Sequence, residues 1–396
     1  LPACHSRVCS GATVAKIEIK LDSHHDDKIY RPGTTVHGEV KITPWENTHF
    51  HSVAVILLGI SKIPMETARS ARVISHVFLS INMPISQSLP PLFEAGHTYS
   101  IPFSVVIPTR LTLSAFKHEN QSGAVFDQHT RLPPFMGYWS KDELLPEVAR
   151  VEYIIKAYVA RGSPGFSGSL KKTTIAKHLT NVLPDPVEDP PLHIALQDER
   201  YTLDRTKALR KNIFSAKQGL FTILATQLSA IRLIPDGNTV SENALFIGLR
   251  FDPISPETAP PSVRSIDGVI IAATWLSGVP THAMHDQGNK HSSSVYPVKQ
   301  GFSVPFPLVF PDLKGGASWT KSGENTALHY EATLQVPLEI PTQPNMILPT
   351  FHTCHISRTY TPAVTVRVAN TESSIDVPVQ IIIDPDTQTS PDALPR

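Results

Sequence analysis

The sequence predicts an all-β protein built from two tandem β-sandwich domains, and three observations support this fold class. Proline supplies 36 of the 396 residues, about twice its ordinary share, and proline is excluded from helix interiors. Apolar and polar residues alternate along much of the chain, which is typical of strands with one buried face. The two halves of the chain also share a sequence signature on either side of a proline-rich segment, which predicts two related domains.

Composition removes several classes of protein. The 35 basic and 35 acidic residues cancel, whereas nucleic-acid binding needs an excess of Lys and Arg. Hydrophobic residues make up 41% and charged residues 18% of the chain, so it is not a disordered protein. The longest apolar run is Val53–Leu58, far short of the roughly 20 residues that span a bilayer. Cys4, Cys9 and Cys354 are too few for a disulfide framework, and with no signal-peptide pattern we expect a cytoplasmic protein.

Strands are predicted wherever apolar residues fall at every second position, as in Lys16–Leu21, Val36–Ile42 and Val364–Val368. Turn signals such as Arg31-Pro32-Gly33 separate them. The only segment with a helix-like apolar pattern is Leu203–Lys217.

The acidic, proline-rich stretch Asn181–Pro191 is the best linker, because four prolines cannot occupy a central strand. We therefore predict an N-terminal sandwich over residues 14–182, a linker over 183–199 and a C-terminal sandwich over 200–384. Residues 1–13 and 385–396 are expected to be flexible ends.

The internal repeat rests on two matches in the same order. Ser100–Pro108 aligns with Ser303–Pro311 at five identical positions of nine, and Val151–Val159 aligns with Leu328–Val336. The spacing between the matched segments is longer in the first half. This predicts an insertion there that includes Arg131–Trp139, a poor strand and an expected surface loop.

Taken in order, these segments resemble the arrestin family. Tyr30–Val40 resembles the Pro-Gly hairpin and the Val-x-Gly-x-Val strand that open the arrestin N domain, His51–Gly59 and the Ile-Pro-Phe segment fit the same domain, and Leu348–Tyr360 resembles a late segment of the C domain. The resemblance covers residues 14–384, and Leu132–Phe135 is most similar to fungal arrestin-related trafficking adaptors.

The resemblance implies two immunoglobulin-like sandwiches, the arrestin N and C domains, in a cytosolic adaptor without catalytic centre or cofactor. Such an adaptor binds cytoplasmic tails of membrane proteins at the plasma membrane or endosomes. It recruits a WW-domain ubiquitin ligase, which marks the cargo for endocytosis. The sequence departs from this pattern because it has no Pro-Pro-x-Tyr motif, only the near misses Pro90–Phe93 and Pro133–Met136.

Two other functions remain open. A retromer-type cargo-sorting subunit would share the two-sandwich layout and bind coat subunits instead of a ligase. A β-sandwich hydrolase would need a nucleophile with a base and an acid, and Gly165–Ser169 is the only stretch that resembles a nucleophile elbow. We interpret that stretch as a flexible loop.

Two segments carry side chains of the kinds that bind metal ions. His24–Asp27 offers suitable side chains, but neighbouring ligands on a hairpin diverge, so this segment is interpreted as a polar turn. His352, Cys354 and His355 provide too few converging ligands for a tetrahedral site and are interpreted as structural strand residues.

Basic residues near the linker are the best candidates for partner binding. They could meet anionic lipid, or an acidic or phosphorylated tail, through charge-assisted hydrogen bonds, although a solvated polar connector would have the same composition. The candidates are Arg200, Arg205, Lys207, Arg210, Lys211 and Lys217. Lys16 and Lys20 form a second candidate pair on one face of the first predicted strand, where they could equally serve to keep an edge soluble.

Overall fold

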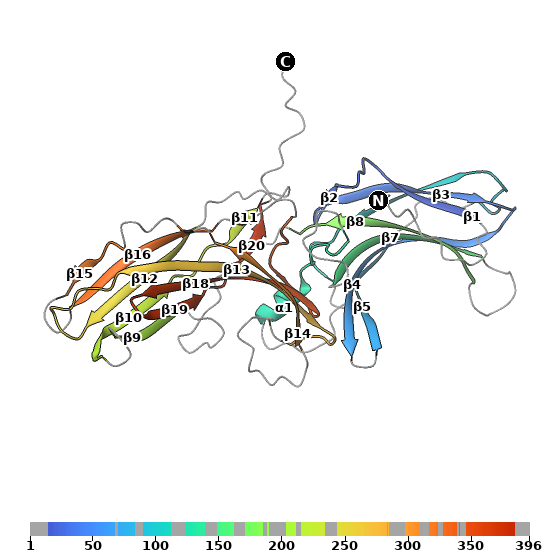
Figure 1. The fold of residues 1–396 in the computed structure, drawn as a ribbon. Helices are drawn as coiled ribbons and strands as arrows, with labels where there is room; N and C mark the ends of the chain where they lie inside the picture. The colour runs from blue at the N-terminus through green and yellow to red at the C-terminus, as the bar shows by residue number, and fades with distance from the viewer. Residues whose placement is uncertain are drawn as a thin grey trace, which may run out of the picture. The chain divides into compact units, whose positions relative to one another are not determined.

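The computed structural model describes residues 15–67, 70–83, 90–111, 123–138, 149–161, 171–184, 188–189, 203–210, 215–233, 244–282, 284, 298–308, 310, 317–323, 328–338, 340 and 346–384. Contacts divide the chain into two compact units, with the division between Pro184 and Asp185. This division lies inside the segment predicted as the linker. Strands dominate both units and a single helix, α1, occurs in the described part (Figure 1), so the predicted all-β fold is confirmed.

The first unit pairs its strands into two sheets. One sheet has the order β1-β3-β6, and the other has the order β2-β8-β7-β4-β5. Alternate side chains fill the interior, among them Val40 and Ile42 on β3 and Val55 and Leu57 on β4, all at most 1% exposed. The elements are β1 (Ala15–Leu21), β2 (Ile29–Tyr30), β3 (Thr35–Pro44), β4 (Phe50–Thr67), β5 (Ser70–Met83), β6 (Tyr99–Val106), α1 (Gly123–Thr130), β7 (Arg150–Arg161) and β8 (Lys171–Val182).

The second unit has sheets of order β15-β16-β12-β10-β9 and β14-β13-β18-β17, with β19 paired to β18 and a parallel pair β11-β20. Its core follows the same alternation, with Ile247 and Leu249 on β12 buried. The strands are β9 (Asp204–Arg210), β10 (Lys217–Ala225), β11 (Ile231–Leu233), β12 (Ala244–Pro253), β13 (Val263–Ser277), β14 (Val298–Pro307), β15 (Thr320–Ser322), β16 (His329–Pro337), β17 (Phe351–His352), β18 (Ile356–Val368), β19 (Thr371–Asp376) and β20 (Ile381–Ile383).

The two units follow one pairing plan. In the first unit β3 pairs with β1 and β6, and β4 pairs with β5 and β7. In the second unit β12 pairs with β10 and β16, and β13 pairs with β14 and β18. Each plan also has an antiparallel pair, β7-β8 or β18-β19, and a two- or three-residue parallel pair, β2-β8 or β11-β20. The two units therefore share this pairing plan, to which the second unit adds β9, β15 and β17.

The predicted alignment of the two copies is nevertheless wrong. Ser100–Val106 lies in β6, whose counterpart by pairing is β16, whereas Ser303–Pro307 lies in β14, the counterpart of β5. Val151–Val159 lies in β7, the counterpart of β18, and not of the strand that holds Leu328–Val336. Both β6 and β14 are edge strands, where proline is tolerated because a missing N–H costs no ladder bond. The shared Pro-Phe pattern reflects this edge chemistry.

Two further predictions are wrong. The expected helix over Leu203–Lys217 is instead the edge strand β9 followed by the start of β10. Only Leu209 is buried on β9, so its alternation is too weak to be read from the sequence. The expected surface loop Arg131–Trp139 is buried from 132 to 137. The backbone N–H of Phe135 donates to the Val182 carbonyl, and Met136 exchanges backbone bonds with Val151.

Candidate partner-binding edges

The basic candidates of the second unit gather on its edge strand. Arg205, Lys207 and Arg210 lie on β9, and Lys217 begins β10 directly opposite Arg210. Six of the seven β9 residues are exposed, since β9 terminates its sheet and only Leu209 reaches the core. Arg200 and Lys211 lie outside the described residues. The structure therefore places three of the predicted basic side chains on one strand.

These side chains keep their positive charge uncompensated. Lys207 donates from Nζ to the backbone carbonyl of Glu372 at 2.5 Å, and Arg210 donates from Nη1 to the Ser215 carbonyl at 3.2 Å. Within the described part of the chain no carboxylate forms an ion pair with Arg205, Lys207 or Arg210. A carbonyl fixes a cation without neutralising it, so β9 is an electropositive edge.

The main chain of β9 adds a second kind of binding group. One side of β9 is bonded to β10, and no described strand pairs with its other side. Such an edge offers a row of backbone N–H and C=O groups to an incoming extended segment. Arg205 and Lys207 lie on the same face of β9 as buried Leu209, and their register partners on β10 are Ile223 and Phe221. Both side chains are exposed on this last strand of the sheet, so a segment added to its open side would lie beside them.

The second predicted pair, Lys16 and Lys20, lies in a different setting. Both are exposed on β1, the edge of the β1-β3-β6 sheet. Lys16 pairs with Glu18 at 2.7 Å, and Lys20 lies opposite Glu39 in the β1-β3 register. A hydrogen bond from Lys16 lowers the pKa of Glu18, which keeps that carboxylate charged. Glu39 itself forms its ion pair with Lys41 at 2.9 Å, so positive and negative side chains alternate along and beside the β1 edge.

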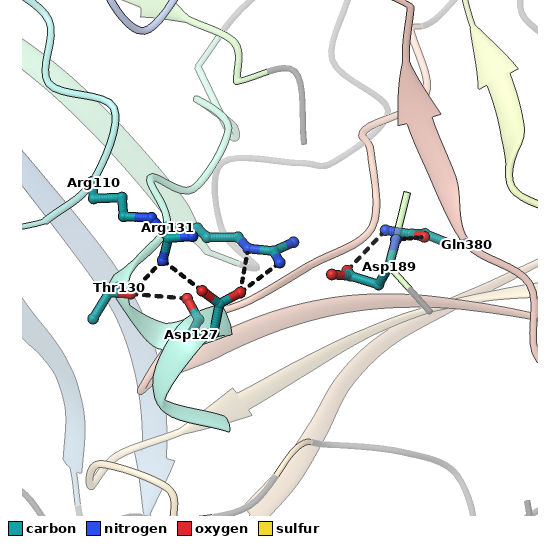
Figure 2. Close-up of polar contacts among 6 residues, drawn as sticks. All are labelled: Arg110, Asp127, Thr130, Arg131, Asp189 and Gln380. Carbon is teal, nitrogen blue, oxygen red and sulfur yellow. Dashed lines mark hydrogen bonds and ion pairs between the residues drawn. The ribbon is translucent and has the colours of Figure 1, made fainter. Parts of the chain in front are cut away.

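A cluster that the sequence did not reveal ties α1 to the preceding loop (Figure 2). Arg110 donates to Asp127 Oδ1 at 2.6 Å and to Thr130 Oγ1 at 3.2 Å, while Arg131 reaches Asp127 Oδ2 at 2.5 Å. Burial would raise the pKa of Asp127, but hydrogen bonds from Arg110 and Arg131 outweigh it and lower that pKa. The cluster holds the helix end in place.

In the second unit, acidic residues of the predicted linker are fixed by specific bonds. The Asp189 backbone N–H donates to Gln380 Oε1 at 2.9 Å, and Gln380 Nε2 donates back to Asp189 Oδ2 at 3.0 Å (Figure 2). Glu188 accepts from the Ala230 N–H at 2.8 Å and from Arg232 at 3.0 Å. These two residues are therefore docked on β11 and next to β20, where a free linker would make no such bonds.

The candidate metal ligands of the second unit lie at the turn between β17 and β18. Cys354 and His355 are buried between β17 and β18, and His352 ends β17. Burial raises the pKa of the Cys354 thiol to about 12, and burial lowers the pKa of His355, whose Nδ1 lies 3.1 Å from the Ser277 carbonyl. Gly165–Ser169 lies outside the described residues. Over the ranges given above, no three His, Cys, Asp or Glu side chains form a metal cluster.

Residues 314–382 match the family model described as the Bul1 C terminus. This stretch is similar to the Bul1 C terminus. It supports the arrestin-like interpretation of the chain and covers the second unit from β15 almost to the end of β20. No curated protein matches the chain.

The Bul1-like stretch contributes to both features of the second unit. It holds Glu372, whose carbonyl accepts from Lys207, and Gln380, which grips Asp189. It also contains the whole of Leu348–Tyr360, which the sequence relates to the arrestin C domain. In the part of the chain that the structure describes, no helix is long and apolar enough to cross a bilayer.

Proposed function

We propose that this chain is a non-catalytic arrestin-like adaptor. In this proposal it binds cytoplasmic segments of membrane proteins and brings them to a WW-domain ubiquitin ligase, so that the cargo is endocytosed or sorted. The observation that carries the proposal is the shared pairing plan of the two units, because tandem copies of one sandwich are the layout that the arrestin resemblance implies. The Bul1-like stretch adds independent support.

The binding surface we propose is the electropositive edge of β9. An extended cargo segment would add to the open side of β9 through main-chain hydrogen bonds, and acidic or phosphorylated side chains would meet Arg205 and Lys207. An exposed ion pair contributes about 0.2–1 kcal/mol, so a single contact of this kind is weak. Adaptors of this design gain strength when several contacts act together on a membrane surface.

A double charge reversal tests this surface. The variant Arg205→Glu/Lys207→Glu should lose membrane-protein cargo in proximity labelling from native cells while a ubiquitin ligase is still labelled. With a synthetic acidic or phosphorylated peptide, we expect at least about tenfold weaker binding by fluorescence anisotropy, most strongly at low salt.

The matched control is Lys321→Glu on β15, because Lys321 is an exposed lysine on the opposite edge strand of the same sheet. This variant should label cargo as the wild type does. Labelling of coat subunits without a ligase would favour the retromer-type function. Equal loss of cargo in both variants would refute the β9 surface.

A further inference from the structure

The two faces of the edge strand β9 differ in their chemistry. Arg205 and Lys207 lie on the face that also carries buried Leu209, and both are exposed. The residues between them in the sequence lie on the outer face of the sheet, and they are Asp204, Thr206, Ala208 and Arg210. One face of β9 therefore carries two cations two residues apart, whereas the middle of the outer face carries no charge.

On the outer face, β9 borders apolar side chains of β10. Ala208 lies opposite Leu220, and Asp204 lies opposite Leu224. These leucines are 37% and 39% exposed. Leu224 covers the neighbouring strand β12, because a Cβ at Gly248 would lie 2.8 Å from its Cδ1. Leu220 instead has only the methyl group of Ala208 between itself and the open side of β9.

This arrangement leaves room for an apolar side chain from an added strand. Such a strand would lie about 4.8 Å beyond β9, so a long apolar side chain opposite Ala208 would pass over the methyl group and contact Leu220 within about 4.5 Å. The next outer position makes no such demand. The hydroxyls of Thr206 and Thr222 are bonded to each other at 2.8 Å and need no further partner.

We propose that the β9 edge recognises an extended segment in which acidic residues alternate with large apolar residues. This inference rests on the proposed cargo surface at β9 and adds a sequence requirement to it. Successive side chains of a strand point to opposite faces. Acidic residues two apart would therefore meet Arg205 and Lys207, while the apolar residue next to them would reach Ala208 and Leu220.

The requirement concerns the order of the residues as well as their composition. A slip of one residue moves every side chain of an added strand to the other face. Acidic residues would then lie beside Asp204, and apolar residues would lie beside the exposed cations Arg205 and Lys207. Both changes weaken binding, so the two faces of β9 favour one phase of the alternation.

Three short synthetic peptides test this requirement on the whole chain by fluorescence anisotropy. Thr-Glu-Leu-Glu-Leu-Glu-Thr has the alternation, Thr-Leu-Glu-Glu-Leu-Glu-Thr has the same composition in a broken order, and Thr-Glu-Ser-Glu-Ser-Glu-Thr keeps the acidic positions without the leucines. The first peptide should bind about fivefold more tightly than either of the others, as a favourable cross-strand apolar contact would give.

Two matched variants locate the apolar contact. Leu220→Ser should bind the leucine and serine peptides equally. Leu224→Ser changes an equally exposed leucine of the same strand that leans away from β9, and it should keep the wild-type preference. Far-ultraviolet circular dichroism shows whether each variant is folded, and Leu220→Thr replaces Leu220→Ser if that variant fails to fold.

Equal affinity of the wild type for the three peptides would overturn the alternation, and so would an unchanged preference in Leu220→Ser. The proposed cargo surface fails in a different way. If it is wrong, Arg205→Glu/Lys207→Glu binds the serine peptide as the wild type does. If it is right and only the alternation is wrong, that variant loses affinity for all three peptides to the same extent.

Discussion

The hydroxyl of Tyr153 offers a sharp test of how the segment after α1 is held in the core. Tyr153 lies on β7 with 0% of its surface exposed, and its Oη donates to the carbonyl of buried Pro133 at 2.7 Å. Burial, with a smaller contribution from Tyr138, raises the pKa of Tyr153 well above its usual value, so the donor is present at any working pH. Tyr153→Phe keeps the ring and leaves the buried carbonyl without this donor, which should cost about 1–3 kcal/mol.

The measurement is equilibrium urea unfolding, and Tyr99→Phe is the matched control. Tyr99 Oη accepts from the backbone N–H of Glu94 at 2.9 Å in an exposed setting, where water replaces the lost partner, so the control should cost less than about 1 kcal/mol. The reasoning fails if Tyr153→Phe unfolds like the wild type, or if the control is as destabilised as the buried variant.

Two other substitutions test the packing and the charge cluster. A Cβ at Gly59 would lie 2.7 Å from Cζ of the buried Phe78 ring, so Gly59→Ala should lower the free energy of unfolding by about 1–3 kcal/mol. The control is Gly248→Ala, whose new methyl group meets only the exposed, flexible Leu224 side chain. Its free energy of unfolding should stay within about 1 kcal/mol of the wild-type value in the same urea assay. Because the folded-state pKa of Asp127 is lowered, its stabilisation exists above the unfolded-state pKa of about 4 and is lost as pH falls through the folded-state pKa. Asp127→Asn should therefore be less stable than the wild type at pH 7, and the difference between their free energies of unfolding should shrink by pH 3. A difference that stays constant between these pH values would contradict the assigned ion pairs.

Much of the fold could be predicted from the sequence because each strand has one buried face. The alternating segments Lys16–Leu21, Val36–Ile42 and Val364–Val368 lie in β1, β3 and β18. Alternation reports which residues face the core, and this depends only on local geometry. It does not report which strand lies next to which.

That limit explains the failed alignment of the two copies. Ser100–Pro108 and Ser303–Pro311 resemble each other because β6 and β14 both end a sheet, and edge strands share a tolerance for proline. The true counterparts, β6 and β16, are related by their pairing with β3 and β12. The two edge strands β6 and β14 are therefore more alike in sequence than β6 and its topological counterpart β16.

The site residues show the same division between local and distant information. The charge of β9 could be counted from the sequence, since Arg205, Lys207 and Arg210 are close together. The carbonyl of Glu372 that accepts from Lys207 lies 165 residues away. The hydrogen-bonded contact between His24, in the turn after β1, and His178 on β8 likewise has no local signal, because nothing near either histidine specifies which strand packs against it.

The shared topology also relates the two predicted binding edges. β1 corresponds to β10. β1 pairs with β3, which also pairs with β6, and β10 pairs with β12, which also pairs with β16, the counterpart of β6. In the described part of the chain β1 ends its sheet, whereas β10 is covered by β9. In the second unit, β9 is paired antiparallel with β10. An extended segment could add to the open edge of β1 in the same way. Charge then distinguishes the two edges: the carboxylates of Glu18 and Glu39 lie among the lysines at the β1 edge, so acidic segments should prefer β9.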